Sequence, residues 1–477
     1  MTNGISTEEP IQLFEKQRKI YPKLVEGVYR RRKWILMSIC LAIYYLAPFI
    51  RWDRGPNAPD QAILIDMVNR RAYWFFIEIW PHEVYYFTAI MVFAAIAIIF
   101  ATSLLGRVWC GYFCFQTVWT DLFLWVERVM QGDRAERMKL DAAPWSFNKL
   151  WRKVGTHLGW LSIGLFTGGA FVLYFNDAPT LVRQVMEGGR SNTVKIFIFG
   201  LTGSTYLMAG FAREQVCTYM CPYARFQSAM FDEDSLIISY DAKRGEQRGK
   251  HKKGESWEGR GHCIDCTQCV QVCPMGIDIR EGLQVECIAC GLCIDACDTV
   301  MDKIGLPHGL IRYDTERNMR EQLPGAIVTK APKLRLLRPR TILYTLTLLL
   351  LGSIILLSLL MRPTLNIHVL HDRNPLFVKM SDGEIRNGYT VNISNRELEP
   401  RSYTLTLSGL EGGVLSIQGQ EESIVTVAPD NAARYRVFVR APVQKEARTP
   451  FTITLTPHEN GKPMTTETFF LSREEAR

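Results

Sequence analysis

Eight of the thirteen cysteines in this chain of 477 residues lie between positions 263 and 297. They form two copies of the pattern C-x2-C-x2-C-x3-C. The first copy comprises Cys263, Cys266, Cys269 and Cys273, and the second comprises Cys287, Cys290, Cys293 and Cys297. Three closely spaced thiolates bind three irons of one [4Fe-4S] cluster, and the fourth cysteine of each copy ligates the other cluster. The spacing therefore predicts a bacterial-type 2[4Fe-4S] ferredoxin module, in which Cys297 completes the first cluster and Cys273 the second.

Two other chemistries use dense cysteines. Zinc sites usually combine two separated C-x2-C pairs, whereas each copy here packs three cysteines tightly, and disulfides require an oxidising compartment. Pro274 follows the first copy as the cluster pattern requires, but Asp298 stands at the equivalent position of the second. This departure alters one turn and leaves all the ligands in place. A ferredoxin module carries single electrons, so the rest of the chain must indicate their source and destination.

Five stretches of the chain are free of charged residues over lengths that suit a bilayer, where about 17–25 residues form a helical span. These stretches are residues 34–50, 84–105, 158–175, 196–212 and 341–361. A soluble protein would need an unusually large core to bury five such helices. We therefore expect an α-helical membrane domain with five transmembrane helices, four of them within residues 34–239.

The distribution of basic residues orients these spans, because Lys and Arg gather on the cytoplasmic side of a membrane. Arg30 to Lys33 directly precede the first span, and loop 106–157 is basic. The run before the fifth span carries Lys330, Lys333, Arg335, Arg338 and Arg340. We therefore expect a membrane protein with a cytoplasmic tail at 1–33. The ferredoxin module, at 240–330, should also lie in the cytoplasm, where thiols stay reduced.

The composition changes after the fifth span. Residues 362–477 contain no cysteine and read as short alternating stretches such as GYTVNISN, SYTLTLSG and PFTITLTP, separated by turn residues. Alternation with a period of two over many short strands is typical of an antiparallel sandwich. We expect an immunoglobulin-like domain on the periplasmic side.

Four of the other five cysteines form two C-x3-C pairs. Cys110 and Cys114 follow the second span, and Cys217 and Cys221 follow the fourth, in what reads as an internal repeat. A spacing of four places both thiols of a pair on one helix face. In the expected topology both pairs reach the cytoplasmic face and form a four-thiol pocket. Such a pocket suits copper(I), zinc, a further iron–sulfur cluster or a dithiol–disulfide cycle, although buried cysteines also occur as plain packing residues.

The remaining candidates carry weaker signals. Cys40 lies alone within the first span and Met220 lies inside the second pair, and both are expected to pack as apolar side chains. His82 lies at the outer membrane interface, where either a quinone headgroup or a plain interfacial role would explain it. His368 and His371 are three apart on an expected strand, so they point to opposite faces and do not suit a shared metal.

Segment 240–261 is basic and rich in glycine. Its composition is typical of a solvated linker. The alternative is contact with an acidic partner or with lipid headgroups, which would dock the ferredoxin module on the membrane.

Together these features resemble one known family, the cytochrome c oxidase accessory proteins of the CcoG/FixG type. The resemblance rests on both C-x3-C pairs, the segment YDAKRGEQRG at 240–249, the paired ferredoxin motif, the fifth span and HDRNPLF at 371–377. Polyferredoxin subunits of periplasmic nitrate and nitrous-oxide reductase systems are similar over the second span to Cys297, but they generally lack the outer sandwich. The first pair here is followed by Phe115 and not by proline, so the two halves are not expected to be equivalent.

The resemblance implies a protein of the bacterial inner membrane that assists in assembling the copper-containing cbb3-type oxidase. The reaction it implies is reduction of Cu(II) to Cu(I). The partners it implies are oxidase assembly factors or copper carriers and an unidentified electron donor. No nucleic-acid partner is expected, and a homo-oligomer is compatible with the sequence. On this hypothesis the ferredoxin module supplies electrons to the pocket formed by Cys110, Cys114, Cys217 and Cys221.

Two other functions are compatible with the same residues. One is a relay that takes electrons from quinol, with His82 and its aromatic neighbours as the quinone site, and passes them to a periplasmic reductase. The other is a scaffold without redox function, in which the outer domain holds a partner and the clusters are structural.

Overall fold

The computed structural model describes residues 19–55, 58–189, 192–251, 254, 256–322, 335–362, 365–397, 399–420, 422–458 and 463–472. Lys330, Lys333 and most of the expected N-terminal tail lie outside these residues. The chain divides into two compact units. The first comprises Met1–Ile50 and Gln61–Ile355, and the second comprises Arg51–Asp60 and Leu356–Arg477. All the cysteines belong to the first unit.

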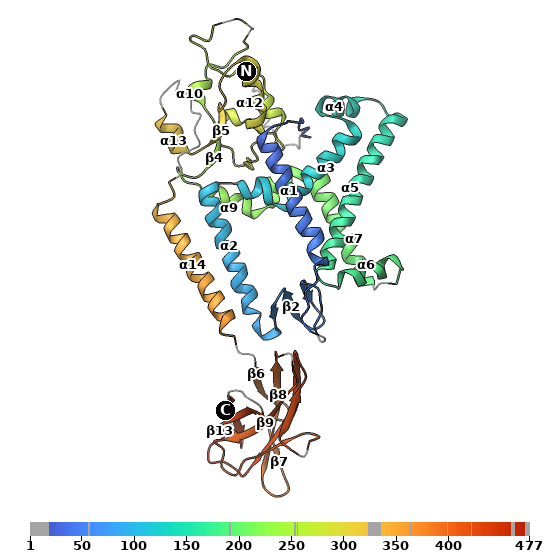
Figure 1. The fold of residues 1–477 in the computed structure, drawn as a ribbon, viewed down its shortest axis with the longest axis vertical. Coiled ribbons are helices and arrows are strands. Elements are labelled where there is room, and N and C mark those ends of the chain that lie inside the picture. Colours follow the sequence, from blue (N-terminus) through green and yellow to red (C-terminus); the bar gives the residue numbers. More distant parts are fainter. Residues whose placement is uncertain are drawn as a thin grey trace, which may run out of the picture. The chain divides into compact units, whose positions relative to one another are not determined.

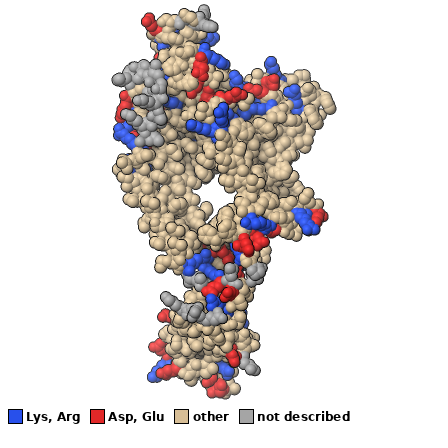
Figure 2. Space-filling view, viewed as in Figure 1, with Lys and Arg blue, Asp and Glu red and all other residues tan. Residues whose placement is uncertain are grey.

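Four helices in the described part of the chain are long and apolar enough to cross a membrane. They are Pro81–Leu105, Phe147–Leu173, Asn192–Met220 and Pro339–Leu360, and they contain α2 (Tyr85–Leu105), α5 (Phe147–Leu173), α7 (Asn192–Leu207) and α14 (Pro339–Leu360) (Figure 1). They match the second to fifth expected spans. Charged side chains of the first unit gather near the ends of these helices, and the surface between is almost free of charge (Figure 2).

The expected first span differs from the other four. Helix α1 (Val28–Leu46) begins with Arg30–Lys33 as part of its first two turns, so only residues 34–46 are both α-helical and uncharged. A single 3-10 turn, Ala47–Phe49, follows them. At 1.5 Å per residue the length of 34–46 is roughly 20 Å, whereas the hydrocarbon core of a bilayer is about 30 Å thick. By length and composition the described residues contain four candidate spans, and α1 is not clearly a fifth.

Several short helices connect the spans. Helices α3 (Phe115–Gln131) and α4 (Arg134–Ala142) lie between α2 and α5, and α6 (Ala178–Met186) precedes α7. A small antiparallel sheet of β1 (Ile63–Asp66), β2 (Arg71–Trp74) and β3 (Ile77–Ile79) joins α1 to α2. No pattern in the sequence predicts this sheet, because its strands are very short.

The cysteine-rich module is closed by a two-stranded sheet. Strand β4 (Ile237–Tyr240) pairs antiparallel with β5 (Ile311–Asp314), which brings the two ends of the insertion together. Between them lie α10 (Ala242–Gly245), α11 (Gln268–Gln271) and α12 (Leu292–Ile304), and α13 (Glu316–Glu321) follows β5. Their core combines Ile238, Ile294, Met301 and Leu310 with the thiols of Cys263 and Cys269. Apolar side chains therefore surround the cysteines on the inner side of the module.

The second unit is the expected sandwich of two antiparallel sheets. One sheet has the order β10-β12-β8-β6, with β7 also pairing β8, and the other has the order β11-β9-β13-β14. The strands are β6 (Leu365–His371), β7 (Val378–Lys379), β8 (Ile385–Asn395), β9 (Arg401–Ser408), β10 (Val414–Ile417), β11 (Ile424–Val427), β12 (Asn431–Ala441), β13 (Arg448–Pro457) and β14 (Met464–Leu471). Alternate residues of β8, from Ile385 to Ile393, are at most 1% exposed and form the centre of the core.

A hydrogen bond between the two sheets tests this packing. The hydroxyl of Tyr389, on β8, donates a hydrogen bond of 2.7 Å to the carbonyl oxygen of Phe469, on β14. Tyr389→Phe leaves that carbonyl without its partner, and we expect a loss of roughly 1–3 kcal/mol in the opening free energy of the domain. Tyr435→Phe is the matched control, because its bond to Thr426 is exposed. Hydrogen exchange of β8 and β14 peptides measures the difference, and equal effects of both changes would contradict the packing argument.

Candidate redox centre

The structure brings the cysteines of the module together in the crossed sets that the spacing predicts. Cys297 lies close enough to Cys269, Cys263 and Cys266 for these thiols to add to the rise in its pKa, of which burial is the main cause. In the same way, Cys273 lies close enough to Cys290 and Cys287 for these thiols to add to the rise in its pKa that burial causes. These neighbours come from different copies of the pattern, as shared ligation between two cubanes requires.

The two cysteine loops follow the same backbone path. In the first loop Asp265 and Thr267, on either side of Cys266, have φ values of 52° and 54°. In the second loop Ala289 and Gly291, on either side of Cys290, have φ values of 51° and 78°. Left-handed conformations at residues other than glycine are unfavourable, and they persist where the surroundings impose them. The repeated pair of left-handed residues therefore gives both loops the same turn around their second cysteine, Cys266 in the first and Cys290 in the second.

The surroundings of the thiols fit an iron–sulfur group. A cavity beside the second set is lined by Cys269, Cys273, Cys287, Cys290 and Cys293, and otherwise by Ile238, Met275, Ile277, Ile279 and Ile288. Burial raises the pKa of Cys273 to about 12 and that of Cys287 to about 11. Without a metal these thiols are therefore neutral, and a group that replaces their protons with iron removes the cost of burying thiolates.

The four thiols outside the module also converge. Cys110 lies within electrostatic range of Cys114, Cys217 and Cys221. Burial and, to a smaller extent, the neighbouring thiols raise the pKa of Cys110 to about 12, and Arg107 opposes this rise. Its sulfur also donates a hydrogen bond of 3.1 Å to the side-chain oxygen of Gln227, a partner that the sequence analysis missed. The two C-x3-C pairs thus form one cluster of thiols, as their repeated position predicts.

The local geometry of the pairs differs from our expectation of a continuous helix. Cys110 lies in a π-helical turn, Trp109–Phe113, and Cys217 lies in a second one, Val216–Met220. Cys114 and Cys221 then adopt extended backbone and precede α3 and α9 (Pro222–Met230). A turn closed by bonds five residues apart is wider than an α-turn, so the second thiol of each pair begins a new helix instead of continuing the old one.

Among the described residues, no three His, Cys, Asp or Glu side chains lie close enough to hold a single metal ion. This holds for the module thiols as well as for the four outer thiols. The ligands of a cubane are spread around four irons and lie further apart than those of one ion. A single copper ion at the outer thiols would therefore require their side chains to move closer together.

The outer thiols are held directly against the module. The turn that contains Cys110 packs with Val272, Ile288, Cys290 and Leu292. The hydroxyl of Tyr112 is donated to the carbonyl oxygen of Cys290 over 3.0 Å. The guanidinium group of Arg107 donates hydrogen bonds to the carbonyl oxygens of Val285 and Ala224. The second cluster set and the outer thiols therefore share one packed junction.

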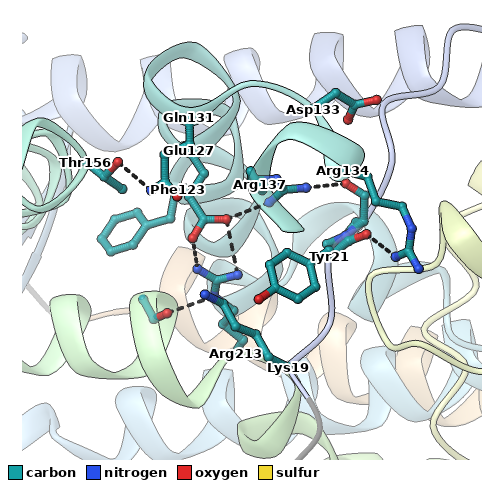
Figure 3. A network of polar contacts seen from close by, with 12 residues as sticks. Lys19, Tyr21, Phe123, Glu127, Gln131, Asp133, Arg134, Arg137, Thr156 and Arg213 are labelled. Carbon is teal, nitrogen blue, oxygen red and sulfur yellow. Dashed lines mark hydrogen bonds and ion pairs between the residues drawn. The ribbon is translucent and has the colours of Figure 1, made fainter. Parts of the chain in front are cut away.

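A buried ion-pair network surrounds Glu127 and includes Arg213, which precedes the second cysteine pair (Figure 3). Glu127, on α3, forms ion pairs with Arg213 over 2.5 Å and with Arg137 over 2.7 Å. Arg137 also donates a hydrogen bond to the carbonyl oxygen of Pro22. Burial opposes ionisation of Glu127, but the two guanidinium groups outweigh it and hold its pKa below the usual value. Arg213 lies four residues before Cys217, so this network positions the second pair.

The remaining candidates lie apart from this centre. His82 is half-buried in the turn Pro81–Glu83, and Cys40 is half-buried within α1. His371 bonds Asn387 over 2.8 Å, while His368 is exposed on the other face of β6, as its spacing predicts.

The basic segment is not a free linker where it is described. The backbone amide of Gly249 donates a hydrogen bond of 3.0 Å to the carbonyl oxygen of Cys263. The amide of Gly261 donates one of 3.1 Å to the carbonyl oxygen of Gln247. Arg244 binds the carbonyl oxygens of Pro307 and His308. The segment is therefore folded onto the first cysteine loop.

Comparison with known proteins agrees with this architecture. The nitrogen fixation protein FixG of Rhizobium meliloti is 47% identical over 459 residues, which cover 90% of this chain and 88% of that protein. Protein RdxA of Cereibacter sphaeroides is 46% identical over 90% of this chain and 91% of its own length. The chain belongs to the FixG family. A crystal structure of a FixG-related protein from Vibrio parahaemolyticus is 22% identical and covers 24% of this chain and 99% of that chain, with a TM-score of 0.21.

Family models divide the FixG-like chain in the same way as its structure. A 4Fe-4S dicluster domain matches residues 212–316, which include Cys217, Cys221 and all the module cysteines. A 4Fe-4S binding domain matches residues 87–131, which include Cys110 and Cys114. The IG-like fold at the C-terminal of FixG matches residues 355–473. The chain is therefore a FixG-like membrane protein that transfers electrons through 4Fe-4S centres.

Serine substitutions test the crossed ligand sets. Cys297→Ser should give the same spectrum as Cys266→Ser, since both remove the first cluster, and Cys273→Ser should match Cys290→Ser. Each change should remove roughly four of the eight module irons. Iron analysis and electron paramagnetic resonance provide the measurements, with Cys40→Ser as the control. A Cys297→Ser spectrum that matches Cys290→Ser would contradict the assignment.

The junction depends on a glycine. A Cβ atom at Gly111 would lie 2.6 Å from the carbonyl oxygen of Ile288 and 3.0 Å from that of Ala289, and both contacts are with backbone. We expect Gly111→Ala to weaken the junction by roughly 1–3 kcal/mol and to lower the temperature at which the visible iron–sulfur absorbance is lost. Gly169→Ala is the control, because its Cβ would meet nothing within 4 Å. An unchanged bleaching temperature in Gly111→Ala would contradict the close packing.

Proposed function

We propose that this FixG-like protein reduces Cu(II) to Cu(I) at the cluster formed by Cys110, Cys114, Cys217 and Cys221. The observation that carries the proposal is the packed junction between Cys110 and the Cys290 loop. One electron converts one Cu(II) into one Cu(I). The module, when loaded with its two [4Fe-4S] clusters, supplies centres that accept and donate single electrons.

The residues around the outer thiols suit a copper substrate. Thiolates are soft ligands that favour Cu(I) over Cu(II), so binding at these cysteines assists the reduction. The guanidinium of Arg107 lowers the pKa of Cys110, which helps the thiol to release its proton to the solvent as copper binds. Cys217 and Cys221 are less buried than Cys110, so they provide the accessible side of the pocket.

In the proposed topology the module and the N-terminal tail face the cytoplasm and the sandwich faces the periplasm. Helix α1 then completes a fifth crossing despite its charged start. Two features support this. Arg30 and Lys33 are 5% and 3% exposed and pair with Asp121, so protein and not lipid surrounds them. The other end of α1 meets the end of α5, where the hydroxyl of Tyr174 is donated to the carbonyl oxygen of Tyr44.

The product of this reaction fits the assembly of a copper-containing oxidase of the cbb3 type. Cu(I) is the form that thiol and thioether carriers transfer, so assembly factors or copper carriers are the proposed recipients. The sandwich is a further candidate contact surface for such partners.

A second candidate concerns the outer thiols alone. The match of a 4Fe-4S binding domain to residues 87–131 favours iron at Cys110 and Cys114. In that case the outer thiols hold a further cluster, and the protein is an electron relay without a copper substrate.

One experiment separates these functions. In the purified protein, the double change Cys217→Ser and Cys221→Ser should reduce the rate of Cu(I) formation at least tenfold, because two of the four copper ligands are lost. Its iron content should remain that of the unchanged protein. Cu(I) is measured with a chromogenic chelator after reduction of the module by dithionite, and Cys40→Ser is the control. Loss of iron in the double variant would support the further cluster, and undiminished Cu(I) formation would refute the thiol pocket.

A further inference from the structure

A groove on the other side of the Cys290 loop is not used by the proposed copper reaction. It has a volume of ≈ 510 Å³ and lies between α1, the Cys110 turn and the module. It is lined by Tyr29, Arg32, Ile35, Leu36, Val108, Tyr112, Leu236 and Tyr313. Four of these side chains are aliphatic, three are tyrosines and one is a cation.

The tyrosines form the wall between the groove and the second cysteine loop. The hydroxyl of Tyr313 donates a hydrogen bond of 2.5 Å to the carbonyl oxygen of Ala289. The hydroxyl of Tyr112 donates a hydrogen bond of 3.0 Å to the carbonyl oxygen of Cys290. The ring of Tyr29 lies 5.3 Å from that of Tyr313. A molecule in the groove is therefore separated from a cluster ligand, Cys290, by a single side chain.

The depth and chemistry of the groove define its occupant. Arg32 lies in the basic start of α1 and Ile35 and Leu36 lie in its apolar part, so the groove crosses from the membrane surface into the apolar region. Tyrosine rings offer faces for stacking with a planar ring. The Tyr112 and Tyr313 hydroxyls already donate to carbonyls, so their oxygens remain as acceptors. Arg32 is an exposed donor.

We propose that this groove binds a membrane hydroquinone, which is the electron donor of the protein. The proposal rests on the copper reduction proposed above. An isoprenoid hydroquinone has a planar ring, two hydroxyl groups and an apolar tail, and each finds its complement in the groove. An anionic phospholipid would use Arg32 but would have no reason to lie beside a cluster ligand.

The stoichiometry of this donor matches the two cysteine sets. Oxidation of one hydroquinone to the quinone releases two electrons and two protons. The two electrons reduce two Cu(II) to two Cu(I), and the protons pass to water at the open mouth of the groove. Two single-electron sites in the module have the capacity for both electrons from one donor molecule.

Filling the groove tests the proposal. Ile35 is 52% exposed, so Ile35→Trp should block the groove without disturbing a core. Ile43→Trp is the control, because Ile43 is 62% exposed on the same helix and does not line the groove. The probe is decylubiquinone, and saturable binding is measured by equilibrium dialysis of the full-length protein in nanodiscs against empty nanodiscs. We expect about a tenfold higher Kd for Ile35→Trp, a smaller increase for Arg32→Gln and no change for Ile43→Trp.

Two reductants separate this proposal from the proposed function. Copper reduction driven by decylubiquinol should fall about tenfold in Ile35→Trp, while reduction driven by dithionite should be unchanged. Equal binding by Ile35→Trp and unchanged protein, or displacement of the quinone by phosphatidylglycerol, would overturn the hydroquinone site. Saturable quinone binding and bleaching of the clusters by decylubiquinol, without Cu(I) formation, would instead refute the copper reaction and retain the site.

Discussion

The contact between the Cys110 turn and the Cys290 loop is the constraint on which the arrangement of the redox centres depends. Its bonds end on backbone carbonyls, since Arg107 reaches Val285 and Tyr112 reaches Cys290. Gly111 brings the two backbones together without an intervening side chain. The same backbone carries the left-handed residue Ala289, which is part of the turn around Cys290. One set of contacts therefore determines both the distance between Cys110 and the module thiols and the shape of the Cys290 loop.

Buried carboxylates on α3 determine where the surrounding segments attach. Asp121 binds Arg30 and Lys33 of α1, and Glu127 binds Arg137 of α4 and Arg213 before the second cysteine pair. Burying ion pairs contributes little net stability, but removing one partner leaves an uncompensated charge at a cost of about 3–5 kcal/mol. The main effect of these ion pairs is therefore to fix where α1, α4 and the segment before the second cysteine pair attach to α3. They allow charged turns of α1 to lie beside apolar helices.

Local patterns in the sequence predicted the elements of this structure better than the contacts between them. Alternation of apolar residues identified every strand of the sandwich, and uncharged stretches identified four of the spans. The first span was less clear than the others, because charged residues occupy the turns that begin α1. Gly111, Gln227 and Glu127 gave no signal, since each acts through a partner more than 80 residues away in the chain or through a backbone contact. The cysteine spacing was informative because ligation is local chemistry.

The two outer cysteine pairs occupy equivalent turns but differ in their surroundings. Cys110 is buried, bonded to Gln227 and packed against the module, whereas Cys217 and Cys221 are partly accessible. Proline at 222 fixes the start of the helix after the second pair, and Phe115 gives the first pair no such restriction. Cys114 of the first pair is also partly accessible. In the proposed reaction the asymmetry therefore assigns electron delivery to Cys110 and access for copper to the second pair. A duplicated motif has thereby become a site with an inner and an outer side.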